Sequence, residues 1–465
     1  MKTIKTLFFI SALIFSNTFV SAQFLLYGTT YSDYYAKGTV FKCNPSGLIK
    51  DICTFDTVPD SLYTPDDGLI LAKDGNMYGV VRGGTYNNGA LYKVTTSGTL
   101  SVIANFNNTV TGEYPICNLL QANDGNFYGT CIAGGSSNNG TIFKCTPMGT
   151  LSILANLSGE SYSSLVQGTD SALYGVTRLG GTYNYGTIFK CTLSGVLTTL
   201  VNFNRTNGSY PECERLLFVG DTIMYGTTYG VGDTLASDTS TLFKCTTSGV
   251  LTTLHRFPRA EIMGGLILAS DSNLYGLSQM DGTFGFGTLF KSTLNGTLTT
   301  MVNFSGPNGQ FPWGTLMEAS DSNLYGTTTV GGAYGGGTVF QYKLSGTLTS
   351  IISFNGSSTG AYPERQSLVE IIKKDTGTGI NKLTTANEEL RVYPNPFTNT
   401  TTIALSTAGN YYLEIDDLTG RKLKYIEFTG NEYILSAEGL AKGMYFVRIS
   451  DINNSVIGTT KIVVQ

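Results

Sequence analysis

The chain has 465 residues, of which only 13% are charged, and its formal net charge is −4. Typical soluble proteins carry about 25% charged residues, so this low charge, combined with 57 glycines, indicates an exported all-β protein. The composition argues against a nucleic-acid partner, because such partners require clustered Lys and Arg side chains.

Residues 1–22 are expected to form a secretory signal peptide. Lys2 and Lys5 precede an apolar stretch from Leu7 to about Phe19, and Val20-Ser21-Ala22 suits cleavage before Gln23. The stretch is short for a membrane span, which needs about 20 apolar residues, although a retained anchor helix is the alternative. We therefore expect export through the periplasm to the cell surface or the extracellular space, with no membrane span left after signal removal.

Residues 23–372 are predicted to consist of a unit repeated seven times. The most constant feature of the unit is a Tyr-Gly pair that recurs every 46 to 51 residues. A period of this length is typical of propeller blades. The pairs are Tyr27-Gly28, Tyr78-Gly79, Tyr128-Gly129, Tyr174-Gly175, Tyr225-Gly226, Tyr275-Gly276 and Tyr325-Gly326.

Each unit contains short apolar runs separated by residues that favour turns. The first turn carries Asp followed by Gly or Ser, as at Asp124-Gly125 and Asp271-Ser272, and the third turn always carries Gly. Such runs, rich in Leu, Val, Phe, Tyr and Thr, predict strands joined by tight hairpins. One unit therefore predicts a four-stranded antiparallel sheet.

The two ends of the array predict that it closes on itself. The first unit begins at Phe24 and lacks its own first strand, whereas Ser367–Ile372 forms a spare first strand after the last complete unit. Pairing of Ser367–Ile372 with Leu25–Thr30 would remove two exposed sheet edges. We therefore predict an all-β fold, a seven-bladed β-propeller closed by its N- and C-terminal strands, in preference to an open β-solenoid.

The eight cysteines do not suggest a general disulfide framework. Cys43, Cys145, Cys191 and Cys245 occupy equivalent places in their units. Facing sheets pack about 10 Å apart, whereas a disulfide needs Cα atoms within about 7 Å, so these four are expected to be unpaired. Cys117 and Cys131 flank the Asp124-Gly125 turn almost symmetrically and are a candidate disulfide.

The repeat ends near residue 372, and residues 373–389 are expected to form a polar linker. Residues 390–465 contain about six short alternating runs, at Thr401–Leu405, Tyr411–Ile415, Lys422–Glu427, Glu432–Leu435, Gly443–Ile449 and Gly458–Val463. Short alternating strands in so small a segment predict a small β-sandwich.

Residues 390–465 resemble the type A C-terminal sorting domain of the type IX secretion system. The matching segments are Val392–Phe397, Asp417–Arg421, Leu440–Ile449 and Lys461–Val464. The resemblance implies an Ig-like β-sandwich, the type IX secretion machinery as a partner, and cargo that is released or attached to the cell surface. The sorting-motif residues are Pro394, Asn395, Pro396, Phe397, Gly420, Arg421, Gly443 and Tyr445.

The repeat resembles the GloVer tandem repeat of exported proteins over Phe24 to about Ile372. The match is clearest in Leu324-Tyr325-Gly326-Thr327-Thr328, in Gly331-Gly332 and in Gly337-Thr338-Val339-Phe340. That family brings no established catalytic residues, so the resemblance implies no chemistry.

The residues themselves offer few candidates for catalysis. The single histidine, His255, excludes a metal site built from several histidines, and no metal or cofactor is expected. The recurring Asp of the first turn suits turn capping better than calcium binding, which needs several carboxylates in one loop. Glu318 and Glu370 are weak catalytic candidates, because they are expected to be neighbours near the propeller axis, where they could also be solvated channel residues.

Binding is the better-supported function. Antiparallel strand order places the second and fourth connections of every unit on one face, and the longer loops on that face carry many aromatic residues, which suit glycan or protein surfaces. A glycan-active hydrolase or lyase and a passive surface-coat component are the alternatives. The ligand-binding candidates are Tyr31, Tyr34, Tyr86, Tyr183, Tyr185, Tyr229, Phe284, Phe286, Trp313 and Tyr334.

Overall fold

The computed structural model divides into two compact units, residues 1–376 and 377–465. It describes residues 24–31, 38–55, 62–63, 65, 68–230, 240–257, 261–356, 360–365, 367–372, 391–417, 422–451 and 456–465. The expected signal peptide and linker, together with Tyr34, Gly420 and Arg421, lie outside the described residues.

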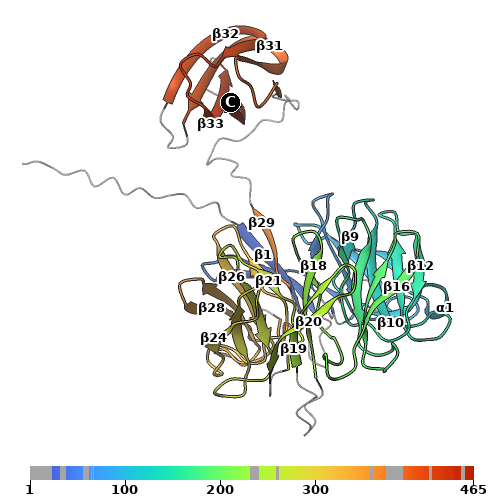
Figure 1. Ribbon diagram of the computed structural model, residues 1–465. Coiled ribbons are helices and arrows are strands. Elements are labelled where there is room, and N and C mark those ends of the chain that lie inside the picture. Colours follow the sequence, from blue (N-terminus) through green and yellow to red (C-terminus); the bar gives the residue numbers. More distant parts are fainter. Residues whose placement is uncertain are drawn as a thin grey trace, which may run out of the picture. The chain divides into compact units, whose positions relative to one another are not determined.

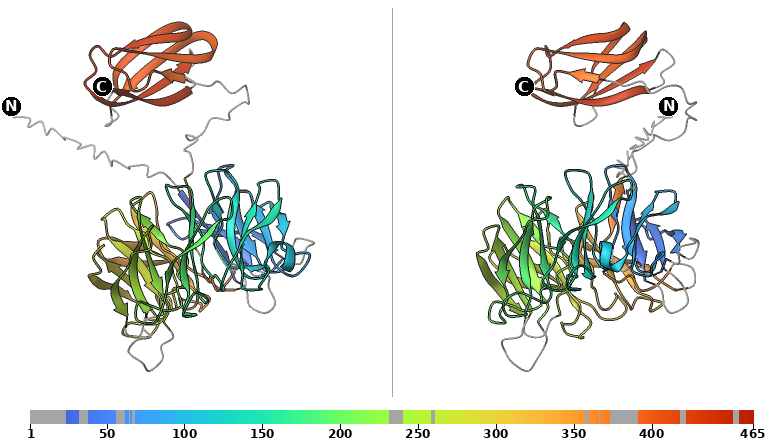
Figure 2. Two further views of the ribbon diagram at one scale, coloured as in Figure 1. Left: turned by 45° about the vertical axis from the view of Figure 1, so that its right-hand side comes forward. Right: turned by 90° about the vertical axis from the view of Figure 1, so that its right-hand side faces the viewer.

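The described strands of the first unit form seven small antiparallel sheets (Figures 1 and 2). We number the sheets in the order of their Tyr-Gly pairs. Sheet 1 contains β1 (Phe24–Thr30), β2 (Thr39–Cys43), β3 (Ile49–Thr54) and β29 (Val369–Ile372); sheet 2 contains β4 (Ile70–Leu71), β5 (Met77–Val81), β6 (Ala90–Val94) and β7 (Leu100–Asn105). Sheet 3 contains β8 (Glu113–Pro115), β9 (Leu120–Gln121), β10 (Phe127–Ala133), β11 (Thr141–Cys145) and β12 (Leu151–Asn156); sheet 4 contains β13 (Val166–Gln167), β14 (Leu173–Thr177), β15 (Thr187–Cys191) and β16 (Leu197–Asn202). Sheet 5 contains β17 (Leu217–Val219), β18 (Ile223–Thr228), β19 (Ser240–Thr246) and β20 (Leu251–Phe257); sheet 6 contains β21 (Ile267–Leu268), β22 (Leu274–Ser278), β23 (Thr288–Ser292) and β24 (Leu298–Asn303); sheet 7 contains β25 (Met317–Glu318), β26 (Asn323–Thr328), β27 (Thr338–Lys343) and β28 (Thr347–Ser353).

Helix is almost absent from the described part of the chain. The helix α1 (Asn108–Thr111) is a single turn between β7 and β8. Among the described residues, no helix has the length and apolar character needed to cross a membrane.

The two central strands of each sheet are buried on both faces. In sheet 6, all five residues of β22 are buried, and β23 has a single less buried position, whereas the outer strand β24 is partly exposed along its length. The glycine of the Tyr-Gly pair is required by this packing. Gly276 pairs with Phe290, and a Cβ atom at Gly276 would lie only 2.5 Å from the Phe290 ring.

The glycine of the third turn allows neighbouring sheets to approach each other. Gly98 and Gly195 have positive φ angles of 99° and 91°, which side-chain-bearing residues rarely adopt. A Cβ atom at Gly98 would lie 2.2 Å from the Ile52 carbonyl oxygen of sheet 1, and one at Gly195 would lie 2.5 Å from the Leu154 carbonyl oxygen of sheet 3. The glycines therefore serve both the turn and the contact with the preceding sheet.

The ends of the repeat array meet as predicted. β29 pairs with β1 in antiparallel register, from Phe24 opposite Ile372 to Tyr27 opposite Val369, and Figure 1 shows β29 beside β1. Sheet 1 also packs against sheet 7, where the Phe24 and Tyr325 rings lie 5.9 Å apart. The first and last strands of the array therefore belong to one sheet, which contacts the seventh.

All eight cysteines lie among the described residues, and none forms a disulfide in the structure. Cys43, Cys145 and the two equivalent cysteines are buried as expected, and burial raises the pKa of the Cys43 thiol to about 12. The predicted disulfide between Cys117 and Cys131 is not formed in the structure. Both thiols are buried, and the Thr130 backbone N–H donates to Cys117 Sγ at 3.3 Å, so the environment accommodates the reduced form.

The second unit is one nearly closed five-stranded antiparallel sheet around its own core. Its strands are β30 (Arg391–Tyr393), β31 (Thr400–Asp416), β32 (Lys422–Ser436), β33 (Gly443–Asp451) and β34 (Val456–Val464). The described residues form five strands in one sheet, in place of the predicted sandwich of about six, because four of the predicted runs join in pairs to form the long strands β31 and β32. These strands pair with each other, with register shifts that mark irregularities along β31.

The described sorting-motif residues connect the start of this unit to its last strand. Asn395 Nδ2 donates to the Lys461 carbonyl oxygen at 2.7 Å, while Asn395 Oδ1 accepts from the Val463 N–H at 2.9 Å. Phe397 is buried and donates from its backbone N–H to the Val463 carbonyl oxygen at 2.9 Å. Pro394 accepts a hydrogen bond from the Thr401 hydroxyl, and Tyr445 is buried at the start of β33. The motif therefore has a structural role in holding the unit together.

Candidate functional site

The aspartates of the first turns are occupied by structural hydrogen bonds. Asp271 accepts from the Asn273 backbone N–H at 3.1 Å, the Tyr275 hydroxyl at 2.9 Å and Lys291 Nζ at 2.8 Å. Partial burial would raise the pKa of Asp271, but the hydrogen bonds from Lys291, Tyr275 and Asn273 outweigh it and hold that pKa below its usual value. The same arrangement recurs at Asp74, Asp124 and Asp170.

The weak catalytic candidates Glu318 and Glu370 connect neighbouring sheets. Glu318 Oε2 accepts from the Ser270 backbone N–H at 2.8 Å, and Glu370 Oε1 accepts from the Ser320 backbone N–H at 3.0 Å. Gln121 accepts in the same way from the Lys73 N–H of sheet 2. Each carboxylate therefore bonds to the first turn of the preceding sheet, so the geometry favours a structural role for both residues.

The longer loops between the second and third strands are held by side chains from the fourth strands. Asn202 Oδ1 accepts from the Thr182 N–H at 2.8 Å, and Asn303 Oδ1 accepts from the Thr283 N–H at 2.9 Å. Asn105 bonds to Thr85 in the same way. These hydrogen bonds hold the loop backbone in place, and with it the residue that follows each of these threonines.

Four of the predicted binding residues occupy this following position and point into solvent. Each is the aromatic tip of its loop and belongs to sheet 2, 4, 6 or 7. The exposed fractions are 56% for Tyr86, 55% for Tyr183, 55% for Phe284 and 70% for Tyr334. Burial of a large aromatic ring is strongly favourable, so four exposed rings in equivalent places mark this face as a candidate contact surface. We call these residues the tip aromatics.

Other predicted binding residues pack within the protein. Tyr185 and Phe286 are only half-exposed, because the Tyr185 ring lies 5.5 Å from Tyr210 and the Phe286 ring lies 5.9 Å from Phe311. These two binding candidates are therefore less accessible than the tip aromatics. Tyr31 and Tyr229 are also half-buried, and each donates from its backbone N–H to the segment that leads into the first strand of its own sheet, at Tyr362 and Tyr210 respectively.

The segments that lead into the first strands converge on one buried carboxylate, Glu214. We call these segments the lead-ins. Glu214 is 6% exposed and accepts hydrogen bonds from Asn118 Nδ2 of the sheet 3 lead-in, Thr315 Oγ1 of the sheet 7 lead-in and Ser367 Oγ of the sheet 1 lead-in. Its backbone also bonds to Ser164 and Met263, from the sheet 4 and sheet 6 lead-ins.

A second buried carboxylate, Glu212, lies beside this centre and pairs with Arg178. The Arg178 Nε atom contacts Glu212 Oε1, and Arg178 Nη1 lies 3.9 Å from Glu160 Oε2. Burial raises the pKa of Glu212, although the positive charges of Arg178 and Arg365 oppose the shift. The negative charge of Glu212 is therefore compensated mainly by the positive charge of Arg178.

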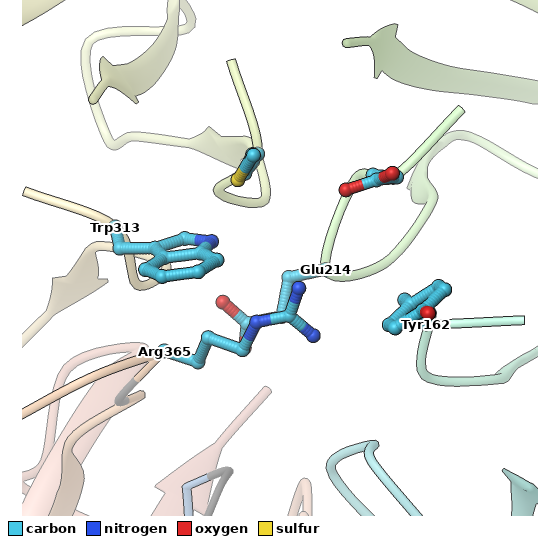
Figure 3. A pocket seen from close by; sticks show the side chains of 6 residues that line it. Tyr162, Glu214, Trp313 and Arg365 are labelled. Carbon is cyan, nitrogen blue, oxygen red and sulfur yellow. The ribbon is translucent and has the colours of Figure 1, made fainter. Parts of the chain in front are cut away.

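A small pocket opens between these lead-ins. Its lining residues come from five sheets: Tyr162, Glu212, Glu214, Met263, Trp313 and Arg365. Figure 3 shows the Arg365 guanidinium between the Trp313 indole and the Tyr162 ring. The guanidinium carbon lies 4.8 Å from the Trp313 ring centroid and 5.5 Å from the Tyr162 ring centroid.

The aromatic and guanidinium contacts continue outward from the pocket. Arg178 lies 5.9 Å from the Tyr162 ring centroid and 5.7 Å from that of Tyr210. Tyr210 contacts Tyr185, over which Arg205 lies at 4.9 Å. Cation–π contacts favour a guanidinium over an aromatic face. This series of contacts therefore holds both the aromatic rings and the guanidinium groups in place.

The sequence pointed to only one residue of this pocket, Trp313. The others were missed because they interrupt the repeat instead of following it. Glu214 and Arg365 are charged residues in the lead-ins, just before the first strands of sheets 5 and 1. Tandem repeats hide such residues, since an alignment of units treats them as irregularities.

The fold is a tandem array of small antiparallel sheets followed by a separate C-terminal unit. The model of the Gloeobacter/Verrucomicrobia repeat matches residues 17–235, 148–291 and 221–378, and that of the secretion system C-terminal sorting domain matches residues 391–465. The chain therefore belongs to the Gloeobacter/Verrucomicrobia repeat family and carries a C-terminal sorting domain. That domain implies handling by the type IX secretion machinery and points to export to the cell surface or extracellular space.

Several solved structures are distantly similar. PorZ, an essential surface component of the type IX secretion system of Porphyromonas gingivalis, is 14% identical, with a TM-score of 0.40 over 95% of this chain and 58% of PorZ. A fungal alcohol oxidase of the AA5 family, in complex with copper, is 12% identical, with a TM-score of 0.44 over 95% of both chains. A puromycin hydrolase is 9% identical, with a TM-score of 0.45 over 82% of this chain and 57% of that enzyme. The chain thus spans little more than half the length of PorZ and the hydrolase. No curated protein sequence matches it.

Proposed function

We propose that this protein is a secreted or cell-surface binding protein whose first unit is a seven-bladed β-propeller. Its ligand is a glycan or a protein, bound on the face that carries the second and fourth connections. Residues 1–22 act as the signal peptide, and the sorting domain directs the chain from the periplasm to the cell surface.

The contacts between sheets support the propeller. An open solenoid would separate sheet 1 from sheet 7, whereas β29 joins sheet 1 and the Phe24 ring packs on Tyr325 of sheet 7. The side chain of Glu214, in the sheet 5 lead-in, accepts hydrogen bonds from the lead-ins of sheets 3, 7 and 1. Convergence of lead-ins from distant units on one carboxylate favours a ring of sheets around a common axis.

The exposed tip aromatics are the observation that carries the binding function. They repeat at one position of four loops, and their backbones are held by hydrogen bonds such as that between Asn202 and Thr182. Aromatic side chains on a rigid scaffold lose little conformational entropy when they bind, and they often dominate interface energies. Glu318 and Glu370 bond to separate backbone amides, so their placement favours binding over acid–base catalysis.

The function can be tested with the full chain on a glycan array, with reducing-end release measured in the same wells. Retention of a glycan without release supports the proposal, whereas release of new reducing ends would favour a hydrolase or lyase. Binding to an identified surface protein in place of a glycan would also support it.

Substitution of the tip aromatics tests which face of the first unit binds the ligand. Tyr183→Ala and Tyr334→Ala should each weaken binding by about 1–2 kcal/mol, with little change in the melting temperature because both rings are exposed. Val196→Ala and Val250→Ala are matched controls, since these exposed apolar residues lie in third turns on the opposite face. Equal binding by all four variants would contradict the proposed face.

A further inference from the structure

We propose that the pocket around Arg365 binds the carboxylate of an acidic glycan, a uronic acid residue within a longer chain. This inference rests on the proposed binding function and specifies its ligand. It follows from the hydrogen-bonding capacity that the pocket leaves unused.

The two carboxylates of the pocket already have partners. Arg178 pairs with Glu212, and Asn118, Thr315 and Ser367 donate to Glu214. These three donors occupy both carboxylate oxygens of Glu214. Neither side chain therefore needs a ligand to complete its interactions.

Arg365 is different, because its contacts are with ring faces. Trp313 and Tyr162 cover the guanidinium at 4.8 and 5.5 Å, its positive charge also acts on Glu212, and among the described residues it forms no hydrogen bond or ion pair. Stacking leaves the N–H groups at the edge of the guanidinium plane available. A guanidinium held in this way presents a planar pair of donors, the geometry that matches a carboxylate.

The remaining surroundings favour a sugar as the carrier of that carboxylate. The Glu212 carboxylate can accept from sugar hydroxyl groups, and the exposed tip aromatics suit the apolar side of a pyranose ring. The enclosed part of the pocket is small, well below the roughly 300–1,000 Å³ of sites for whole small molecules. It therefore receives one group or residue of a larger ligand, while the tip aromatics can contact the rest.

The test uses the full chain and isothermal titration calorimetry with an oligogalacturonate. The methyl-esterified oligomer is the matched probe, because it keeps the sugar rings and removes the charge. We expect the acid form to bind at least tenfold more tightly than the ester. Arg365→Lys should lose tenfold or more in affinity, since a lysine keeps the charge but not the paired donors, whereas Arg256→Lys on the exposed surface of β20 should bind like the wild type.

Each contrary result would overturn the inference. Equal binding of acid and ester by the wild-type chain would do so without any dependence on how a variant folds. Wild-type affinity in folded Arg365→Lys, or equally tight and Arg365-dependent binding of poly-L-glutamate, would exclude the acidic glycan. Retention of neutral glycans alone would overturn this inference and leave the proposed function standing, whereas failure to bind any glycan or surface protein would remove both.

Discussion

At the scale of single residues, Asp271 shows why the repeat keeps the same side chains at the same spacing. Its carboxylate closes its own turn through Asn273, fixes the hydroxyl of the buried Tyr275 and pairs with Lys291 of the third strand. One recurring aspartate therefore ties the first turn to two strands. Because these bonds require the ionised carboxylate, they make the stability of the protein depend on pH.

Acid should weaken the protein through these aspartates. The folded pKa of Asp271 lies below its ordinary value of 3.8, so its stabilising contribution is complete above that value and is lost as the pH falls through the folded pKa. Asp271→Asn should lower the free energy of unfolding at pH 7 by about 0.5–1 kcal/mol, the range of partly exposed ion pairs. The difference from the wild type should shrink below about pH 4, as measured by urea unfolding between pH 2.5 and 7.

Sheet 5 supplies the control for this prediction. Its first-turn residue Asp221 is exposed, and the Tyr225 hydroxyl donates instead to the Leu294 carbonyl oxygen at 3.1 Å. Asp221→Asn should therefore leave the pH dependence as it is in the wild type. If Asp221→Asn and Asp271→Asn change the acid dependence equally, the Asp–Tyr–Lys arrangement is not its source.

The residue scale also shows where prediction from the sequence ends. The Tyr-Gly pairs and turn residues predicted the sheets and the pairing of the terminal strands, because each reflects a local requirement such as the space beside Gly276. The exposed tip aromatics were predicted from loop position alone. Glu214, Tyr162 and Arg365 were not, since their importance arises from contacts between units far apart in the sequence. The partial burial of Tyr185 and Phe286 was not predicted either, because their ring partners lie in the next lead-in.

At the scale of elements, the lead-ins matter as much as the strands. The first strands of sheets 2, 3, 4, 6 and 7 are only two residues long, so they offer few ladder hydrogen bonds. The lead-ins compensate by bonding to one another around Glu214, which lies where the segments converge. The terminal strand β29 depends on the same centre through Ser367.

Glu214→Ala should therefore destabilise the first unit by about 3–5 kcal/mol, the cost of leaving several buried polar groups without a partner. Glu214→Gln should cost less, because one acceptor oxygen remains. Chemical denaturation of both variants, and of Ser367→Ala alone and in combination with Glu214→Ala, provides a double-mutant cycle. A coupling energy above about 0.5 kcal/mol is expected for residues in direct contact, and strictly additive effects would show that Glu214 does not connect β29 to the other sheets.

At the scale of the whole molecule, the two units have separate cores and separate tasks. The core of the second unit, which includes Leu413, Val447 and Ile462, is formed entirely by its own residues. The first unit has its own closing strand, β29. Because each core is formed within its own unit, we expect the repeat sheets to fold without the sorting unit.

This independence leads to a prediction about export. In a host with type IX secretion machinery, deletion of residues 390–465 should leave the chain in the periplasm, with the melting temperature of the repeat unit unchanged, as checked by cell fractionation and by calorimetry on the purified protein. Asn395→Ala should reduce export more mildly, because it removes the two bonds that hold the motif to Lys461 and Val463 but retains the rest of the sheet. Thr429→Ala, which removes an exposed hydrogen bond to Asn410 within the same sheet, is the matched control and should be exported normally. Arrival of the truncated chain at the cell surface would mean that the export signal lies outside the sorting unit.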